Sequence, residues 1–411
     1  MPETGTPPIP IEDARNQLLA NIYAVEAVET LAIEASVGRI AAENVVSQID
    51  LPATYNAAVD GYGFLAASLK AAPNKAFNIV GVARAGHPFN GQIGADEAIE
   101  IYTGGVMPTG PDCVAMHEEC IRDGDTVLIR AKLSSGSNMR PPGENLGRGE
   151  AVIKIGQTIT PALVGQLAAS GKAEITVHRQ LKVAVISTGD EVVAAGHGLE
   201  AGQISDANRP MLTAMLRGSN VSIIDGGIVP DKLDALVAAY EMALQKADVV
   251  ISSGGASDGI EDHTQRAMQA VGAECAFWRL AMKPGRPMAV GRHGKKLIFC
   301  LPGNPVAAFV CTRLLIGPLL TKLGGGTVLP LLKLSVPAGF SHRKKPGRAE
   351  YLRVVVSGEG DAQQLQLHGR KGAGVISSLT GADGLVEIPL ENAGVEPGMK
   401  LNFLPFHERA L

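Results

Sequence analysis

The sequence has few cysteines and no arrangement of them that is typical of a zinc site. Five cysteines are spread over 411 residues, and none forms a C-x-x-C pair. Scattered, unpaired thiols are typical of a reducing compartment, so we expect a cytoplasmic protein whose cysteines are mostly core residues. Paired Cys and His residues at the spacing of zinc ligands are also missing, which argues against a structural zinc site.

Runs of like charge and long apolar segments are absent as well. The chain carries 37 basic and 41 acidic residues, for a net charge of −4. A dedicated nucleic-acid binder would show a basic patch or stripe, so we expect no nucleic-acid partner. The first ten residues lack the basic start and apolar stretch of a signal peptide. No run approaches the roughly 18 apolar residues of a membrane helix, so we expect no membrane partner.

Several common catalytic signatures are missing too. The sequence has no G-x-x-x-x-G-K-[ST] motif and no G-x-G-x-x-G after a strand pattern. This disfavours a P-loop ATPase and a dinucleotide-dependent dehydrogenase. No Ser-His-Asp or Cys-His arrangement indicates a nucleophilic hydrolase. What the chain does have is 45% hydrophobic residues, which excludes global disorder, and 49 glycines that indicate many tight turns.

The order of the patterns predicts a multidomain protein of the α/β plus β class. A length of 411 residues suits two to four domains. Strand and helix patterns alternate over 181–325, which predicts a parallel sheet between two layers of helices. Short strand patterns over 326–411 predict a C-terminal domain like a β-barrel. The remaining regions are a β-rich inserted domain over 48–145 and a helical connecting domain formed by 1–47 and 146–180.

The strands of the α/β region end in turns rich in glycine and small polar residues. These turns are STGDE at 187–191, GGIVPD at 226–231, SSGGAS at 252–257 and LPGNP at 301–305. In a parallel sheet they all lie at the carboxyl edge, which is where open α/β sheets bind ligands. Glycine lets backbone N–H groups approach an anion, so this edge suits a phosphate or another oxyanion.

Three carboxylates follow the tips of these strands and predict a metal site. Glu191, Asp231 and Asp262 would repel an anionic ligand unless a divalent cation lay between them. Oxygen ligands of this kind suit Mg²⁺, which would polarise phosphate oxygens. Taken singly, each acid is better explained as a cap or turn residue, and only the set on one edge favours a metal site. Asp248 opens its strand and therefore belongs to the opposite edge.

A cationic segment at 278–287 supplies candidate anion ligands. Lys283 and Arg286 flank a Pro-Gly turn, and Arg279 precedes them. Guanidinium and ammonium groups held by a rigid turn suit phosphate or oxyanion recognition. A solvated basic loop is the alternative interpretation.

Together these motifs resemble a known family over nearly the whole chain. The chain resembles the molybdopterin molybdenumtransferases of the MoeA type, the molybdenum insertases that include the gephyrin E domain. The motifs follow one another in the expected order: Asp60-Gly61-Tyr62, Thr103-Gly104, STGDE, SSGGAS with Asp262, KPGRP at 283–287, LPGNPVA at 301–307, KPGR at 345–348, and Ser377-Ser378. Each motif alone is weak, but their ordered combination is specific.

The resemblance implies the reaction and the assembly. Adenylylated molybdopterin is hydrolysed with a divalent cation, Mg²⁺, as molybdate is inserted at the dithiolene, and AMP and molybdenum cofactor are released. The family also implies a homodimer whose active site joins the α/β domain of one subunit to the β-rich domain of the other. The implied partners are a molybdopterin adenylyltransferase and the recipient molybdoenzymes or their chaperones.

The resemblance also implies roles for individual residues. The positions that match the family's catalytic residues are Asp60, Thr103, Glu191, Asp231, Asp262 and Lys283. The positions that match substrate-binding residues, including contacts to molybdate, are Ser257, Arg279, Lys283, Pro302, Pro305, Arg348, and Ser377 or Ser378. Arg286 joins the predicted substrate-binding residues as a cation of the 278–287 segment.

Some positions depart from the family pattern and keep two alternatives open. Ala57 and Ala307 stand where serine is common, Val59 stands where methionine is common, and Arg286 replaces a common lysine. The lost hydroxyls are compatible with a non-catalytic carrier or scaffold for the cofactor. A nucleotide-processing hydrolase of the competence-damage type shares only the α/β region, so the β-type segments on either side argue against it.

Overall fold

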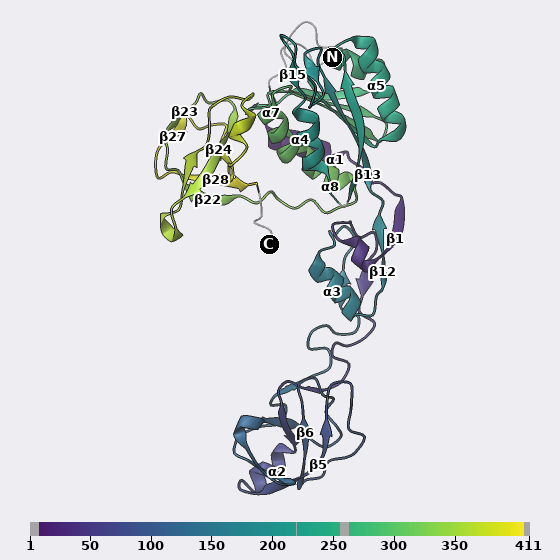
Figure 1. Ribbon diagram of the computed structural model, residues 1–411, viewed down its shortest axis with the longest axis vertical. Helices are drawn as coiled ribbons and strands as arrows, with labels where there is room; N and C mark the ends of the chain where they lie inside the picture. Colours follow the sequence, from purple (N-terminus) through teal and green to yellow (C-terminus); the bar gives the residue numbers. More distant parts are fainter. Residues whose placement is uncertain (1–7, 219, 255–262, 407–411) are drawn as a thin grey trace.

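The parts of the molecule follow one another along a long axis. A computed structural model describes residues 8–218, 220–254 and 263–406. The α/β domain lies at one end with the C-terminal domain beside it, and the β-rich domain lies at the other end (Figure 1). A thin connecting region with β1 (Val28–Ala32), β12 (Glu174–His178) and α3 (Pro161–Ala169) joins the two ends.

The α/β domain is built on a six-stranded sheet with the order β16-β13-β17-β21-β20-β18. The first four strands are parallel, as the alternation of strand and helix patterns predicts. β20 and β18 add an antiparallel edge that the sequence patterns did not reveal. The strands are β13 (Leu181–Thr188), β16 (Val221–Val229), β17 (Val249–Ser253), β18 (Glu274–Arg279), β20 (Pro287–His293) and β21 (Lys296–Leu301).

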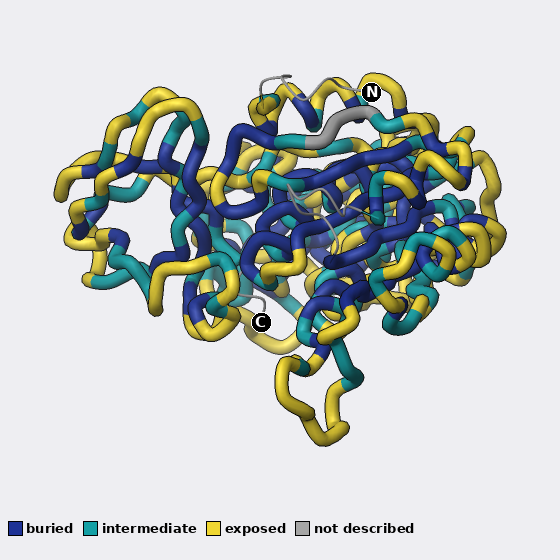
Figure 2. Tube along the Cα trace, turned by 90° about the horizontal axis from the view of Figure 1, so that it is seen from above, coloured by how far each residue is buried: buried dark blue, intermediate teal, exposed yellow. Residues whose placement is uncertain are grey.

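Helices cover both faces of this sheet and confirm the three-layer fold. Alternate residues of β13 enter two different cores: Val183 and Val185 face one side, and Ala184 and Ile186 face the other. In the view from above, buried segments run through the middle of the molecule and exposed segments lie at its rim (Figure 2). The helices are α4 (Asn208–Leu216), α5 (Leu233–Lys246), α6 (His263–Ala270), α7 (Pro305–Cys311) and α8 (Gly317–Leu323).

The first helix belongs to this α/β core, which corrects its expected place in the connecting domain. α1 (Ile11–Ala20) buries Ile11, Ala14 and Leu18 in the same cluster as the inner residues of β13 and α8. The three- and four-residue spacing predicts the buried face of a helix correctly. It carries no information about the surface against which that face packs.

α7 and α8 are parts of one long apolar helix. We did not predict this helix, because we found no long apolar run in the sequence. Pro305–Leu323 is long and apolar enough to cross a membrane by length and composition. Most of it is buried, and its leucines pack in the α/β core, so it is a core helix of this domain. It widens to π-helical geometry over Thr312–Ile316, just before Pro318, which has no N–H group for the helical ladder.

The connecting region is less helical than its sequence suggested. β1 (Val28–Ala32) pairs with β12 (Glu174–His178) over five residues, and α3 packs with a short 3₁₀ turn in a separate small core. The remaining elements are η1 (Ile33–Ser36), β2 (Val45–Val46), β11 (Ala151–Ile153) and α3 (Pro161–Ala169).

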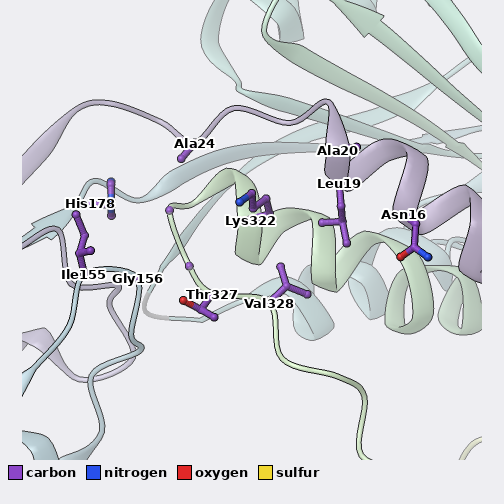
Figure 3. A pocket seen from close by; sticks show the side chains of 12 residues that line it. Asn16, Leu19, Ala20, Ala24, Ile155, Gly156, His178, Lys322, Thr327 and Val328 are labelled. Carbon is purple, nitrogen blue, oxygen red and sulfur yellow. The ribbon is translucent and has the colours of Figure 1, made fainter.

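A groove of about 750 Å³ marks the junction between this region and the α/β domain. It lies between α1, α8 and the turn at Ile155 (Figure 3). His178 and Lys322 are its titratable lining residues, and none of the predicted site residues lines it.

The β-rich domain has a six-stranded sheet with the order β7-β4-β6-β5-β9-β8 and an apolar cluster on each face. A two-stranded ribbon of β3 and β10 lies at the side where the connecting region enters. The elements are β3 (Asn56–Ala57), β4 (Gly61–Phe64), α2 (Ala66–Ala71), β5 (Ala76–Ala83), β6 (Glu97–Ile101), β7 (Cys113–Met116), η2 (His117–Glu119), β8 (Cys120–Asp123), β9 (Thr126–Ile129) and β10 (Met139–Arg140).

One strand of the C-terminal sheet comes from the sequence of the α/β domain. β19 (Met282–Lys283) pairs in parallel with the start of β24, in the sheet order β19-β24-β26-β28-β22. The backbone of the KPGRP motif is therefore fixed to both domains. The strands are β22 (Leu334–Pro337), β23 (His342–Arg343), β24 (Ala349–Ser357), β25 (Gln364–Leu367), β26 (Gly384–Ile388), β27 (Gly394–Val395) and β28 (Lys400–Pro405), with the short turns η4 (Gly360–Ala362) and η5 (Ile376–Ser378).

Asp248 lies at the amino edge of the α/β sheet, as predicted, and forms a structural ion pair. Both of its oxygens accept hydrogen bonds from Arg179, at 2.7 and 2.8 Å, and Lys182 N–H donates to it at 2.8 Å. Burial raises the pKa of Asp248, but these hydrogen bonds outweigh burial and hold the pKa below its ordinary value. The folded state is therefore stabilised above the unfolded pKa, and this contribution is lost as the pH falls through the folded pKa.

We expect Asp248→Asn to lower the free energy of unfolding by about 1–3 kcal/mol at pH 7, because it leaves the half-buried Arg179 with a weaker partner. The difference from the wild type should shrink below the ordinary aspartate pKa of about 4. Urea unfolding followed by far-UV circular dichroism measures this difference. The exposed Asp361→Asn is the control. A difference that stays constant from pH 7 to pH 3 would contradict this account.

Candidate functional site

The carboxyl edge of the α/β sheet is held together by polar contacts between strand tips. Asn208, at the start of α4, donates from Nδ2 to Ser253 Oγ and to the Gly303 carbonyl, both at 2.7 Å. It therefore ties the end of β17 to the turn after β21. Gly254 approaches the Thr188 carbonyl so closely that a Cβ atom at this position would lie 2.1 Å from that oxygen. The SSGG turn needs glycine here to reach the tip of β13.

One of the expected turns is placed differently. Gly226 and Gly227 lie inside β16 as a bulge, because the pairing shifts where Asp225 and Ile228 oppose β13. A Cβ atom at Gly226 would lie 2.4 Å from the Ile186 side chain, so this glycine serves strand packing. The turn that carries Asp231 begins only at Pro230.

Two of the three predicted metal ligands follow neighbouring strands. Glu191 comes after β13 and is exposed, and Asp231 comes after β16. Asp231 N–H donates to Asp190 Oδ1 at 3.1 Å, so the two acidic turns are in contact. Asp262 and Ser257 lie outside the described residues. Within residues 8–218, 220–254 and 263–406, no three His, Cys, Asp or Glu side chains form a metal-binding group.

The predicted cations converge where the α/β and C-terminal domains meet. Lys283 Nζ lies 3.4 Å from Glu350 Oε1, and Arg348 Nε lies 4.0 Å from the same oxygen. His342 Nε2 lies 2.9 Å from the other carboxylate oxygen of Glu350. Glu350 is 3% exposed, whereas Lys283 and Arg348 are 54% and 44% exposed. Two cations thus face solvent around one buried carboxylate.

Burial alone raises the pKa of Glu350. The hydrogen bonds from His342 and Lys283, together with the charge of Lys283, outweigh that effect and hold the pKa below its ordinary value. The carboxylate is therefore ionised at neutral pH. Sequence reasoning missed both Glu350 and His342. The only available signal for Glu350 was its position two residues after Arg348, at the start of a strand pattern.

A cavity of about 240 Å³ adjoins this cluster. Lys283 and His342 line one part of it, and the loop over His368–Ala373 lines another. The same loop reaches the α/β domain, because Val306 N–H donates to the Ala373 carbonyl at 3.0 Å. The start of α7, with Pro305 after the Pro302 turn, is thus placed beside the C-terminal domain.

Other predicted ligands of this region differ in their access to solvent. Arg286 is exposed and Arg279 ends β18. Ser377 is exposed, but Ser378 is fully buried. The Ser378 hydroxyl donates to the Val375 carbonyl and accepts from Arg353 Nε at 2.9 Å. The Ser378 hydroxyl therefore shapes the loop, and of the two alternatives Ser377 is the serine that is exposed to solvent.

Asp60 and Thr103 meet in the β-rich domain. Both the backbone N–H and the hydroxyl of Thr103 donate to Asp60 Oδ1 at 2.7 Å. The backbone hydrogen bond from Thr103 is the main reason that the pKa of Asp60 lies below its ordinary value. β3, β10 and the Thr103 turn are joined by backbone bonds, which places Arg140 beside Asn56 on the same ribbon. The β-rich domain, which carries this group, lies at the other end of the molecule from the α/β domain (Figure 1).

Comparisons with known proteins cover nearly the whole chain. Residues 9–171 match the model of the MoeA N-terminal region (domains I and II), 184–322 the probable molybdopterin-binding domain, and 335–406 the MoeA C-terminal region (domain IV). A molybdopterin molybdenumtransferase of Haemophilus influenzae is 32% identical over 97% of this chain and 98% of its own length. The chain belongs to the MoeA family. A molybdopterin molybdenumtransferase of Staphylococcus aureus is 29% identical over 97% of this chain and 95% of its own length.

Solved structures of the MoeA family agree with this assignment. A molybdopterin biosynthesis MoeA protein from Pyrococcus horikoshii OT3 matches with a TM-score of 0.82 and 25% identity, covering 97% of this chain and all of that chain. Another Pyrococcus MoeA structure matches with a TM-score of 0.78 and 30% identity, covering 97% of this chain and 99% of that one. These matches extend over nearly the whole chain. They therefore argue against the hydrolase alternative, which accounted only for 181–325.

Two departures from the MoeA family pattern lie away from solvent. Ala57 is fully buried in an apolar cluster of the β-rich domain, and Ala307 is 2% exposed within α7. A serine hydroxyl at either position would face the protein interior in this fold. The two alanines therefore remove no polar group from the surface of the candidate site.

Proposed function

We propose that this chain inserts molybdenum from molybdate into adenylylated molybdopterin and releases AMP. Two observations support the proposal: acidic turns at the carboxyl ends of α/β strands, and a cluster of cations that faces solvent. Acidic turns follow β13 and β16, and the solvent-facing cations Lys283 and Arg348 lie at the junction with the C-terminal domain. The cations bind an oxyanion such as molybdate. The acids bind the divalent cation that accompanies a phosphoanhydride.

Each group has a defined task in this reaction. Lys283 and Arg348, with the Ser377 hydroxyl, hold molybdate by charge-assisted hydrogen bonds. Backbone N–H groups of the glycine turns at the strand tips hold phosphate oxygens. Water attacks the adenylyl phosphorus, the bond to the molybdopterin phosphate breaks, and AMP leaves with the oxygen of that water. Placing both substrates at one edge couples this cleavage to metal insertion.

The acidic turns fit a magnesium ion by the chemistry of their donors. Glu191 and Asp231 offer hard oxygen ligands on two turns that contact each other, and Asp262 is the proposed third ligand. When bound there, Mg²⁺ would neutralise charge on the phosphate oxygens. Asp190 contributes by fixing the Asp231 turn against the β13 turn.

We further propose that the active site is completed by a second copy of the chain. Asp60 and Thr103 lie at the opposite end of the molecule from the α/β edge (Figure 1), so one chain cannot bring them to that edge in this conformation. A twofold dimer in which the β-rich domain of each subunit approaches the α/β edge of its partner resolves this separation. A molybdopterin adenylyltransferase would supply the substrate, and apo-molybdoenzymes or their chaperones would receive the product.

The proposal is tested by AMP release from adenylylated molybdopterin, measured with and without molybdate and Mg²⁺. We expect release that depends on both, and a product that activates an apo-molybdoenzyme. Tight binding of the substrate without AMP release would instead establish the carrier or scaffold alternative.

A further inference from the structure

Glu350 places a negative charge directly behind the two cations that the proposed function assigns to molybdate. Its contacts are to Lys283, Arg348 and His342, all within 4.0 Å. Lys283 and His342 line the adjoining cavity, and Glu350 does not. An oxyanion that approaches Lys283 therefore competes with Glu350 for the same ammonium group. A buried carboxylate beside a proposed anion site opposes anion binding, so its presence there requires a physical reason.

Local architecture shows that this carboxylate is built into the site. Glu350 pairs in register with Lys283 between β24 and β19, so the backbone fixes their relation. The loop that carries Arg348 is anchored separately, because the buried Lys344 donates to the carbonyls of Pro389 and Asn392 at 2.8 and 2.6 Å. Arg348 therefore does not depend on Glu350 alone for its place. Glu350 therefore acts on the cavity mainly through its negative charge.

We propose that Glu350 is a positioning residue that keeps oxyanion binding weak enough for molybdate to be passed on. This inference rests on the proposed function. Molybdate must leave its cations to reach the dithiolene, and equally tight binding before and during transfer would not speed the transfer. A negative charge that is 3% exposed acts on a nearby dianion with little solvent screening. Lys283 is half-exposed on a flexible stem, so it reaches a ligand without the contact to Glu350.

The test is equilibrium dialysis of molybdate and of perrhenate against the full-length protein. We expect Glu350→Gln, which keeps the shape of the side chain, to lower the Kd for molybdate about tenfold, or 1.4 kcal/mol. Coulomb energy is proportional to ligand charge, so the gain for the monoanion perrhenate should be only about threefold. A change in local structure would not produce this dependence on charge.

Two further variants make the result interpretable. Glu350→Asp keeps the charge but withdraws it by one methylene, so we expect a gain of about two- to threefold for molybdate. Glu387→Gln is the matched control: Glu387 is a mostly buried carboxylate on β26 of the same sheet that pairs with Lys333 and Tyr351. It should change the Kd less than twofold.

The outcomes separate this inference from the proposed function. If the wild type binds molybdate and Lys283→Gln weakens that binding, but Glu350→Gln does not tighten it, only the role of Glu350 is wrong. Equal gains for molybdate and perrhenate would also overturn that role. If the wild type does not bind molybdate, the oxyanion site itself is wrong.

Discussion

Replacing Lys283 by glutamine is expected to slow AMP release about a hundredfold while leaving the protein folded. Lys283 is the cation whose backbone is fixed by both the α/β and the C-terminal domain, through its place on β19. Its side chain is half-exposed and its ion pair with Glu350 is loose, at 3.4 Å. Glu350 keeps its hydrogen bond to His342 when the ammonium is removed, so we expect a folded protein that loses about 1–3 kcal/mol of stability, whereas an anionic transition state loses a charged partner.

The measurement is AMP release at several molybdate concentrations, with thermal unfolding as the check on folding. A rise in KM for molybdate with little change in kcat would place Lys283 in initial binding, and a fall in kcat would place it in the reacting complex. Lys295→Gln is the matched control, because Lys295 is an exposed lysine of the same domain that pairs with Glu26 at the surface. Unchanged AMP release in Lys283→Gln would remove the cation cluster from the mechanism.

Sequence reasoning was most successful where local patterns determine the structure. The central parallel strands β13, β17 and β21 are buried on both faces, so their apolar runs and glycine-rich ends identify them without a structure. Asp248 was placed at the correct edge because its strand begins directly after it. The strands of the C-terminal domain were found for the same reason, since each is a short alternating run between turn residues.

Sequence reasoning failed where the outcome depends on which distant segments meet. α1 shows the helical period, but its partner, α8, lies some 300 residues later in the chain, and no local pattern records that contact. Ser377 and Ser378 are neighbours of the same type, and only the fold decides that one is exposed and the other buried. Glu350 became a candidate only when β19 was seen to join the C-terminal sheet.

A mixed dimer provides the strongest test of where the active site lies. Asp60→Asn and Lys283→Gln should each inactivate the homodimer, since they remove groups proposed for the same site. If the β-rich domain of one subunit serves the α/β domain of the other, a dimer of the two variants has one site with both substitutions and one intact site. Such a heterodimer, isolated with two different affinity tags, should release AMP at about half the wild-type rate.

The alternative arrangement makes the opposite prediction. If Asp60 and Lys283 of the same chain met in one site, each site of the heterodimer would carry one substitution, and no activity would return. The same result is expected if the chain acts as a monomer, which sedimentation of the wild type would show. Recovered activity cannot arise from contaminating homodimers, because both are inactive. It would therefore mean that the separation of Asp60 from the α/β edge seen in one chain (Figure 1) is bridged by its partner.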